Sequence, residues 1–394
     1  MTKIRVLLVH NYYQNSGGED IVFAAEKKLL AEHGHEVVEY TDDNSRLNTM
    51  NQFSAAANMI WSRSSYRSVK KIIQTRRPAL VHFHNTFLMI SPSAYYACRE
   101  AGVPVTQTLH NYRLLCPAAT FYRASTVCEK CLGSFFAWNG VRYACYRDSK
   151  FQTAGLAAML SFHKILGTWK NLASVYIALT DFSRKKFIEG GLPASKIAVK
   201  PNFVAPDPGF GAANGDYALF AGRLASEKGV LTMLEAWKAL PTPIPLKIVG
   251  DGPVRDEVLK FIKDSSLRAE YLGATSHDQV IALMKDARFL IFPSEWYEGF
   301  PLVIAEAFAC GLPIVSSQIG GMAEIIEDKI TGVFFKSGSA EDLAEKILWV
   351  VNHPVETTQM RLNARKTYLE KYSEEAAYKN ILRVYNIALG RTES

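Results

Sequence analysis

Short apolar runs alternate with longer amphipathic stretches along most of the chain, as strands alternate with helices in α/β proteins. Runs that are continuously apolar indicate buried strands of parallel sheets. RFLIFP (288–293) is such a run, and mainly apolar runs at IRVLLV (4–9), LVHFH (80–84), VPVTQTLH (103–110), SVYIAL (174–179), YALFAGRL (217–224), PLKIVG (245–250) and PIVSS (313–317) are also predicted strands. The pattern predicts an α/β fold of two doubly wound, Rossmann-like domains.

The segment PNFVAPDPGFGAANGD (201–216) is the most loop-like part of the chain, because it is rich in Pro, Gly and Asn. We place the domain boundary there, with an N-terminal domain of residues 1–203 and a C-terminal domain of residues 204–373. The last predicted helix lies within residues 374–394, and we expect it to cross back to the first domain. Two such domains would face a central cleft, since ligands bind outside the carboxyl ends of the strands.

Composition and charge narrow the class of protein. The chain has 394 residues, of which 48% are hydrophobic and 21% charged, with a net charge of +7. These values are ordinary for a globular protein, and no nucleic-acid-binding signature accompanies the moderate positive charge. No apolar run approaches the ~20 residues of a membrane span, and the N-terminal apolar run is too short for a secretory signal. We therefore expect a cytoplasmic protein.

One stretch, WSRSSYRSVKKIIQTRRP (61–78), concentrates positive charge. One interpretation is a solvated helix face. The other is a surface that contacts anionic lipid or a lipid-linked phosphate, which would place the protein peripherally at the inner face of a membrane.

The segment EGFPLVIAE (298–306) carries two glutamates eight residues apart. It follows a predicted strand, and Pro301 is well placed as the first residue of a helix. Glu298 then lies in the turn, and Glu306 lies more than one turn inside the helix. A helix N-terminus favours an anion, which would repel Glu298, so this carboxylate needs another partner. Sugar hydroxyls would serve, because a carboxylate accepts their hydrogen bonds.

Other turns at the same predicted sheet edge carry cations and glycines. AGRLASEKG places Arg223 and Lys228 between a strand and a helix, where a diphosphate would relieve their repulsion; solvated loop charges are the alternative. GDGP (250–253) is another tight turn. In the first half, NSGGE (15–19) supplies Gly17 and Gly18 at a helix start, so a phosphate could approach the backbone. No GxGxxG fingerprint is present.

Together GRLASEKG, GDGP, EGFPLVIAE, CGLPIVSSQIGGMAEII and TGVFF resemble the retaining GT-B glycosyltransferases of family 4 (glycosyl transferases group 1). The resemblance implies a nucleotide-sugar donor whose diphosphate Arg223 and Lys228 neutralise and whose ribose Glu306 holds. It also implies that Glu298 binds the transferred sugar and that His110 lies beside it, as the two catalytic residues. The donor-binding set implied is Gly17, Gly18, Arg223, Lys228, Gly250, Leu272, Glu298, Gly299, Phe300, Leu302, Val303 and Glu306.

By the same resemblance the enzyme is a retaining, metal-independent hexosyltransferase, because two cations and a helix dipole stabilise the leaving group. The donor is expected to be a UDP-sugar, with GDP and ADP left open. The acceptor would be a saccharide or lipid-linked saccharide, in polysaccharide or glycoconjugate synthesis. A front-side mechanism is favoured, and a two-step route stays open. Two other functions also remain: a sugar-nucleotide 2-epimerase, and a non-catalytic nucleotide-sugar-binding regulator.

Four cysteines lie close together after His110. Cys116, Cys128, Cys131 and Cys145 have the spacing C-x11-C-x2-C-x13-C, which is typical of a structural zinc site within an insert at residues 111–147. A cytoplasmic location disfavours disulfides, and buried thiols are the alternative. No cofactor is expected for catalysis. Cys98 and Cys310 are interpreted as core residues, and His82 and His84 as structural or acceptor-facing.

Overall fold

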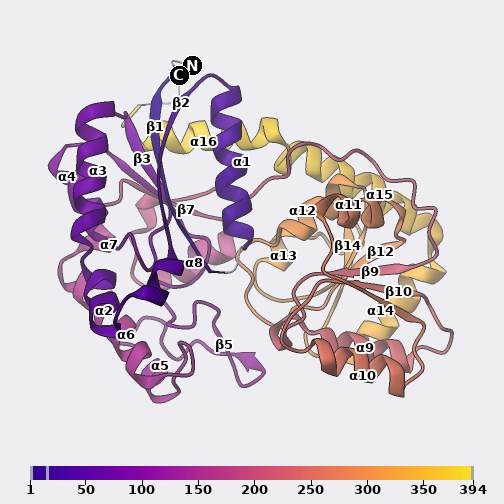
Figure 1. Cartoon of the computed structure of the whole chain (residues 1–394). Coiled ribbons are helices and arrows are strands. Elements are labelled where there is room, and N and C mark those ends of the chain that lie inside the picture. Colours follow the sequence, from indigo (N-terminus) through magenta and orange to yellow (C-terminus); the bar gives the residue numbers. More distant parts are fainter. Residues whose placement is uncertain (1–2, 15–16, 392–394) are drawn as a thin grey trace. The chain divides into compact units, whose positions relative to one another are not determined.

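Two parallel β-sheets of six strands each organise the computed structural model, which describes residues 3–14 and 17–391 (Figure 1). Each sheet belongs to its own compact unit. The first unit contains the chain up to Phe121, Glu129–Pro201 and the segment from Ala377 on, and the second contains Tyr122–Cys128 and Asn202–Ala376. The predicted α/β class with two doubly wound sheets is therefore confirmed. The predicted domain bounds and the cleft stay predictions.

The sheet of the first unit has the order β2-β1-β3-β4-β7-β8. Its strands are β1 (Arg5–Tyr12), β2 (Glu36–Asp43), β3 (Leu80–Asn85), β4 (Val105–Thr108), β7 (Val175–Ala178) and β8 (Ile197–Val199). The helices between them include α1 (Gly18–Glu32), α3 (Arg63–Arg76), α4 (Ser93–Glu100), α6 (Lys150–Ile165), α7 (Thr168–Asn171) and α8 (Asp181–Glu189). The four apolar runs of this half correspond to β1, β3, β4 and β7, which are buried because both of their faces are covered.

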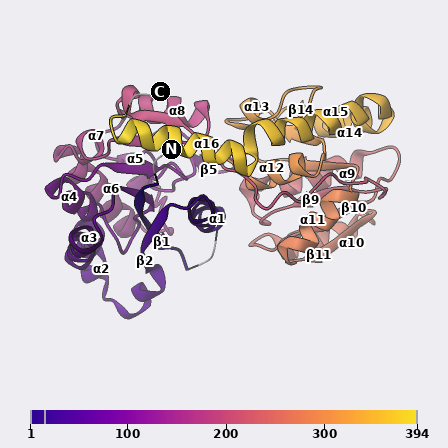
Figure 2. The same ribbon diagram turned by 90° about the horizontal axis from the view of Figure 1, so that it is seen from above.

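Alternate residues of the strands face opposite helix layers. Val6 and Leu80 pack against α1 and against Tyr385 of the last helix, α16 (Glu374–Ala388). Phe83 points the other way and its ring lies 4.6 Å from that of Tyr95 in α4. Helices α3 and α4 lie side by side on that face (Figures 1 and 2).

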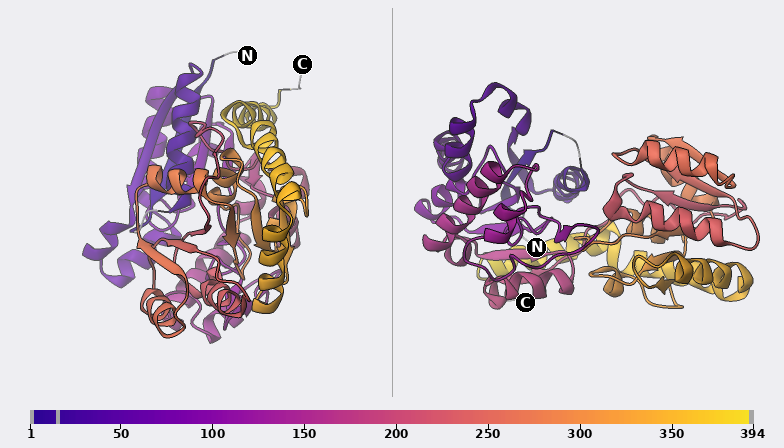
Figure 3. Two further views of the ribbon diagram at one scale, coloured as in Figure 1. Left: turned by 90° about the vertical axis from the view of Figure 1, so that its right-hand side faces the viewer. Right: turned by 90° about the horizontal axis from the view of Figure 1, so that it is seen from below.

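The second sheet has the order β11-β10-β9-β12-β13-β14. Its strands are β9 (Ala218–Ala221), β10 (Leu246–Val249), β11 (Ala269–Gly273), β12 (Phe289–Phe292), β13 (Ile314–Ser317) and β14 (Gly332–Phe335). Helices cover both of its faces (Figures 1 and 3): α9 (Val230–Ala239), α10 (Arg255–Asp264) and α14 (Ala340–Asn352) on one, and α11 (His277–Asp286), α12 (Leu302–Ala309) and α15 (Pro354–Thr367) on the other. The strand order reverses between β9 and β12, where doubly wound folds bind ligands.

Some local features differ from the sequence prediction. Helix α12 begins at Leu302, and Pro301 precedes it in an extended conformation with ψ of 115°. The segment before α3 forms a separate helix, α2 (Gln52–Ile60). The predicted insert contains a two-stranded hairpin of β5 (Tyr122–Arg123) and β6 (Thr126–Val127), followed by the short helix α5 (Trp138–Arg142).

Within the described residues, no helix is long and apolar enough to cross a membrane.

Candidate active site

Two loops meet at the carboxyl ends of β9 and β12 in the second unit. The backbone N–H of Glu295 donates to the carbonyl oxygen of Glu227 at 2.9 Å, which joins the loop after β12 to the loop after β9. Gly229 permits this approach. A Cβ atom there would lie 2.0 Å from the carbonyl oxygen of Pro293, and its φ of +65° also favours glycine. The sequence places two predicted site segments, AGRLASEKG and EGFPLVIAE, in these loops.

Lys228 and Glu298 form an ion pair between these loops, with 2.6 Å between Nζ and Oε1. The hydroxyl of Ser294 also donates to Glu298 Oε1, at 2.9 Å. Only 7% of Glu298 is exposed, and the Lys228 ammonium lies 5.5 Å from the centre of the Trp296 ring. Burial strengthens this pair, since it has little competition from water. Arg223 is exposed and starts the same loop after β9.

Glu306 has a partner that the sequence analysis missed. Its Oε1 lies 2.9 Å from Nε2 of His277, the first residue of α11. The hydrogen bond to Glu306 and its negative charge raise the pKa of His277. The capping box of Ser276 and Gln279, a recognisable sequence signal, starts α11 and so positions His277.

The other predicted donor-binding positions of the second unit lie in turns or at the ends of elements. Gly250 has a φ of +129°, and a Cβ atom there would lie 1.9 Å from the carbonyl oxygen of Gly222. Leu272 lies near the end of β11 and is partly exposed. Gly299 and the buried Phe300 complete the turn before α12. Leu302 and Val303 are the first residues of α12, where backbone N–H groups have no partner within the helix.

Two buried polar atoms near these loops also lack a hydrogen-bond partner in the described part of the chain. They are the indole Nε1 of Trp296 and the hydroxyl of Thr275, which follows β11. An unpaired buried donor or acceptor costs stability, so both atoms are candidates to bond a ligand. The sequence analysis named neither residue, because burial without a partner leaves no pattern in the sequence.

In the first unit, His110 follows β4, is partly exposed and lies against the buried His84. Its Nε2 lies 3.1 Å from Nδ1 of His84, and the two rings are stacked with centres 5.3 Å apart. Burial lowers the pKa of His110 to about 3. His110 is therefore neutral at neutral pH, with one ring nitrogen that donates a hydrogen bond and one that accepts.

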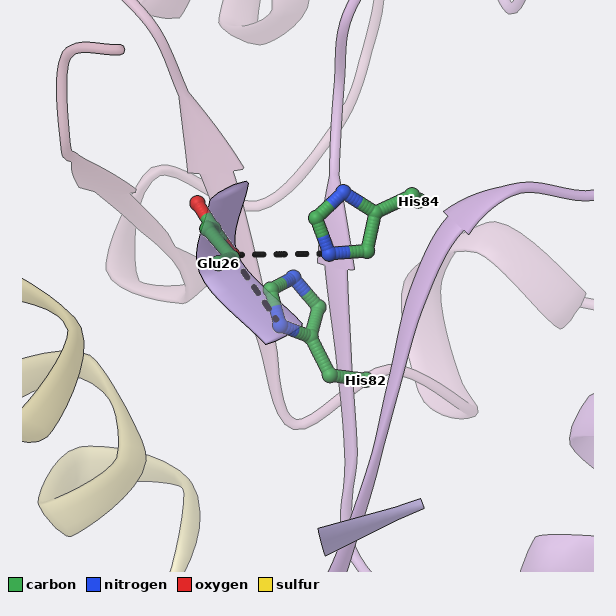
Figure 4. A group of neighbouring side chains, drawn as sticks. All are labelled: Glu26, His82 and His84. Carbon is green, nitrogen blue, oxygen red and sulfur yellow. Dashed lines mark ion pairs between the residues drawn. The ribbon is translucent and has the colours of Figure 1, made fainter. Parts of the chain in front are cut away.

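Next to His84 lie Glu26 and His82, and the carboxylate of Glu26 converges with the ring nitrogens of the two histidines (Figure 4). Glu26 Oε2 is 3.4 Å from His84 Nε2 and 3.8 Å from His82 Nδ1. Among residues 3–14 and 17–391, this is the one group of three or more potential metal ligands within 4.8 Å of one another. The other oxygen of Glu26 bonds the ammonium of Lys200.

These residues do not fit a metal ion. Both nitrogens of His82 already have partners, the Tyr385 hydroxyl at 2.9 Å and the Thr108 hydroxyl at 2.8 Å. A cation would also lie beside the Lys200 ammonium. Burial alone would raise the pKa of Glu26, and the charge of Lys200 lowers it below its usual value. We interpret the group as a buried ionic network behind His110.

The glycine loop of the first unit faces carboxylates. Gly17 precedes α1, and its N–H donates to Asp20 Oδ2 at 2.9 Å, while Oδ1 of Asp20 lies 2.7 Å from His10 Nε2. Burial and the charge of Asp20 raise the pKa of Glu19 to about 8. Gly18 is the first residue of α1, and the Asn and Ser of NSGGE, residues 15–16, lie outside the described residues. Donor binding at Gly17 and Gly18 stays a prediction.

The four cysteines differ in exposure. Cys116 is buried, and Cys128, Cys131 and Cys145 are partly exposed. The zinc site stays a prediction. Cys98 and Cys310 are buried in helical segments, as expected of core residues.

Comparison with known proteins identifies the family of the chain. The family model described as Glycosyltransferase Family 4 matches residues 16–208, and the model described as Glycosyl transferases group 1 matches residues 211–367. An uncharacterized glycosyltransferase of Methanocaldococcus jannaschii is 32% identical over 43% of this chain and 48% of its own length. The chain therefore aligns with about half the length of that relative.

Two further similarities extend over nearly the whole chain. The N-acetyl-alpha-D-glucosaminyl L-malate synthase of Bacillus anthracis is 23% identical over 92% of both chains. The crystal structure of Anabaena Alr3699/HepE in complex with UDP superposes with a TM-score of 0.67 and 19% identity, over 96% of this chain and 99% of the other. That similarity shows the fold, and it confirms the GT-B class predicted from the motifs.

Proposed function

Because the chain belongs to the glycosyltransferases of group 1 and family 4, we propose that it transfers a sugar from a nucleotide-sugar donor to a saccharide hydroxyl. The Lys228–Glu298 ion pair at the strand-order reversal of the second sheet carries this proposal. It joins one cation and one carboxylate beside the N-terminus of α12. That combination suits a ligand with both a diphosphate and sugar hydroxyls.

In the proposed complex, Lys228 and Arg223 bind the diphosphate, together with the first amides of α12. Fixed positive charge there stabilises the negative charge that develops on the leaving diphosphate. Glu298 then accepts hydrogen bonds from the transferred sugar, and Glu306 from the ribose. His110 presents a neutral imidazole to the reacting sugar, and the leaving phosphate deprotonates the acceptor hydroxyl on the same face, with retention of configuration.

The nucleotide we propose is UDP. The solved complex of Anabaena Alr3699/HepE with UDP supports this choice. The name of the Bacillus anthracis relative contains an N-acetyl-alpha-D-glucosaminyl group, so the UDP-sugar of N-acetylglucosamine is one donor to test. A saccharide or lipid-linked saccharide of polysaccharide or glycoconjugate synthesis is the proposed acceptor.

A panel of UDP-, GDP- and ADP-sugars tests the proposal. A donor that binds the folded state raises the melting temperature by mass action, so we expect a UDP-sugar to stabilise the protein. UDP release should then require an added acceptor. UDP release without an acceptor would favour the 2-epimerase, and stabilisation without turnover across an acceptor panel would favour the regulator.

We also propose a peripheral membrane contact through residues 61–78, which contain the whole of α3. Two of its cations already have partners, since Lys70 pairs with Glu100 at 2.7 Å and Arg76 with Glu36 at 3.1 Å. Arg63 and Arg67 are the cations proposed for this contact.

A further inference from the structure

Helix α6 has an apolar stripe on its exposed side. Phe151, Ala158, Phe162 and Ile165 are all exposed. At 100° per residue they lie within about 40° of Phe151 around the helix axis, and the stripe is about 21 Å long. Surface helices normally place polar residues on this side, whereas α6 is apolar there as well as on its buried side, which contains Leu156, Met159 and Leu160.

Neighbouring segments border the stripe on both sides. On one side, His163 Nε2 lies 3.0 Å from the carbonyl oxygen at the end of α2. On the other, the hydroxyl of Ser161 donates to the carbonyl oxygen of Phe135 at 2.8 Å. Helices α2 and α5 both pack against α6 (Figure 1). Phe135 and Trp138 of this bordering segment are 60% and 71% exposed. We call Phe135, Trp138, Phe151, Phe162 and Ile165 the α6 apolar face.

The charges around this face are mostly positive, with Glu129 and Asp148, on either side of residues 130–147, as the exceptions. Residues 130–147 and 149–171 contain no Asp or Glu, whereas the whole chain has 38, and Asp148 is the single carboxylate between the two segments. The same segments contain six Lys and Arg residues, most of them exposed: Lys130, Arg142, Arg147, Lys150, Lys164 and Lys170. Helix α2 has no charged residue. The face therefore combines large apolar side chains with surrounding cations.

We propose that the α6 apolar face binds the surface of a bilayer that contains anionic lipids. Aromatic and aliphatic side chains with surrounding Lys and Arg are the composition of helices that lie in a membrane interface. A second copy of the chain fits less well, because a two-fold symmetric contact would bring the cations of both copies together. This surface differs from α3, and the proposal is independent of which sugar is transferred.

Sedimentation with vesicles tests the proposal on the full chain. We expect wild-type protein to sediment with vesicles of phosphatidylcholine and phosphatidylglycerol and to stay in solution with phosphatidylcholine alone. Phe162→Ser with Ile165→Ser should weaken binding by about tenfold or more, because each side chain loses apolar burial. The matched control is Val355→Ser with Leu362→Ser on α15, which changes two exposed apolar residues of the second unit and should bind as wild type.

A charge variant, melting temperatures, an α3 variant and gel filtration complete the test. Lys150→Gln with Lys170→Gln should weaken binding at low salt and matter less at high salt, because salt screens exposed charges. Equal melting temperatures of all variants show that the fold is intact. The proposal is overturned if the wild-type protein does not sediment with anionic vesicles at low salt. It is also overturned if Phe162→Ser with Ile165→Ser sediments as the wild type does. It is also overturned if Arg63→Gln with Arg67→Gln alone abolishes sedimentation, or if gel filtration shows a dimer that the α6 variant dissociates.

Discussion

At the scale of single residues, Lys228 is the side chain whose partner should change on donor binding. It pairs with Glu298 in the structure, and the diphosphate of the proposed donor would compete for its ammonium. We expect Lys228→Ala to lower kcat by about 10²–10³-fold, since one such contact to the developing charge contributes roughly 3–4 kcal/mol. Arg223→Ala should have a similar effect. Steady-state kinetics measures both losses.

The matched control is Lys260→Ala, an exposed lysine of α10 that pairs with Asp264 at 3.0 Å. It should retain wild-type kcat and the wild-type melting temperature. Near-wild-type turnover in both Lys228→Ala and Arg223→Ala would contradict the assignment of the phosphate-binding residues.

The buried histidines predict how stability depends on pH. The pKa values of His82, His84 and His110 are all lowered, mainly by burial. In the unfolded chain these rings bind protons near pH 6.5, whereas the folded unit binds them only at lower pH. Their contribution is therefore complete above pH 6.5 and decreases as the pH falls. Each ring should add about 1.4 kcal/mol per pH unit to this loss.

Urea unfolding of the full chain between pH 7.5 and pH 4.5 measures this dependence. His82→Gln should make the dependence less steep by about one proton, because one titrating ring is removed. A free energy of unfolding that is constant from pH 6.5 to pH 4.5 would show that the cluster is hydrated or already protonated.

The sequence could predict some contacts between single residues and not others. The difference lies in whether a local pattern marks both partners. Lys228 and Glu298 stand in recognisable turns after strands, so their meeting follows from the shared edge of a parallel sheet. Glu26 and Lys200 are 174 residues apart, and His82 and Tyr385 are 303 apart. Nothing local marks these pairs, and only the packing of α1 and α16 on the sheet brings them together.

At the scale of elements, the turn after β10 tests how closely the loops of the second unit approach. A Cβ atom at Gly250 would meet the backbone of Gly222, which cannot move aside as a side chain can. We expect Gly250→Ala to lower the melting temperature and to weaken donor binding, by loss of the predicted loop contact.

Gly338→Ala is the matched control, because Gly338 also has a positive φ, of +76°, but nothing lies within 4 Å of its added Cβ. It should cost about 1 kcal/mol through backbone strain alone and leave donor affinity unchanged. Equal effects of the two substitutions would show that strain, and not the contact between loops, matters at Gly250.

The cysteine segment allows a second test at this scale. If Cys116, Cys128, Cys131 and Cys145 bind zinc, the purified protein should contain about one zinc per chain, since structural sites with four thiolates hold the metal tightly. Cys128→Ser should then increase proteolysis within residues 111–147, because metal binding and local folding are coupled. Donor binding should change far less than transfer to the acceptor.

Elemental analysis and limited proteolysis measure these two effects, and Cys310→Ser, at the residue that follows α12, serves as a control outside the segment. Absence of zinc, together with four thiols that react readily in the native protein, would contradict the zinc site.

Elements were predictable where their hydrophobic period was long or uninterrupted. Each of the eight apolar runs overlaps a strand, because full burial selects β-branched and aromatic residues on both faces. The separate helix α2 and the β5–β6 hairpin were not predicted. Each strand of the hairpin has two residues, which is too short to show a hydrophobic period. Helix α2 has nine residues, which is also short for a periodic pattern. Helix α12 begins one residue after Pro301 because that residue is extended.

At the scale of the whole molecule, the two units have the same architecture and different chemistry. The second unit places Arg223, Lys228 and Glu298 in loops, and Glu306 in α12, at the reversal of its strand order. The first unit has its polar residues buried, in a network that ends at His110. This division predicts that substitutions in the second unit affect donor binding, while those around His110 affect the rate of transfer more than donor affinity.

The same division leads to a prediction about metal ions. In the proposed site, Arg223, Lys228 and the amides of α12 supply the positive charge that a divalent cation supplies in other transferases. Activity should therefore persist in EDTA during a short assay, and added magnesium or manganese should not change kcat. Parallel assays of Lys228→Ala are informative, because a metal that supplied the charge would make this lysine dispensable. A rapid and complete loss of activity in EDTA, restored by either ion, would contradict a metal-independent diphosphate site. The predicted zinc should remain bound during the short assay, because a closed thiolate site releases its metal slowly.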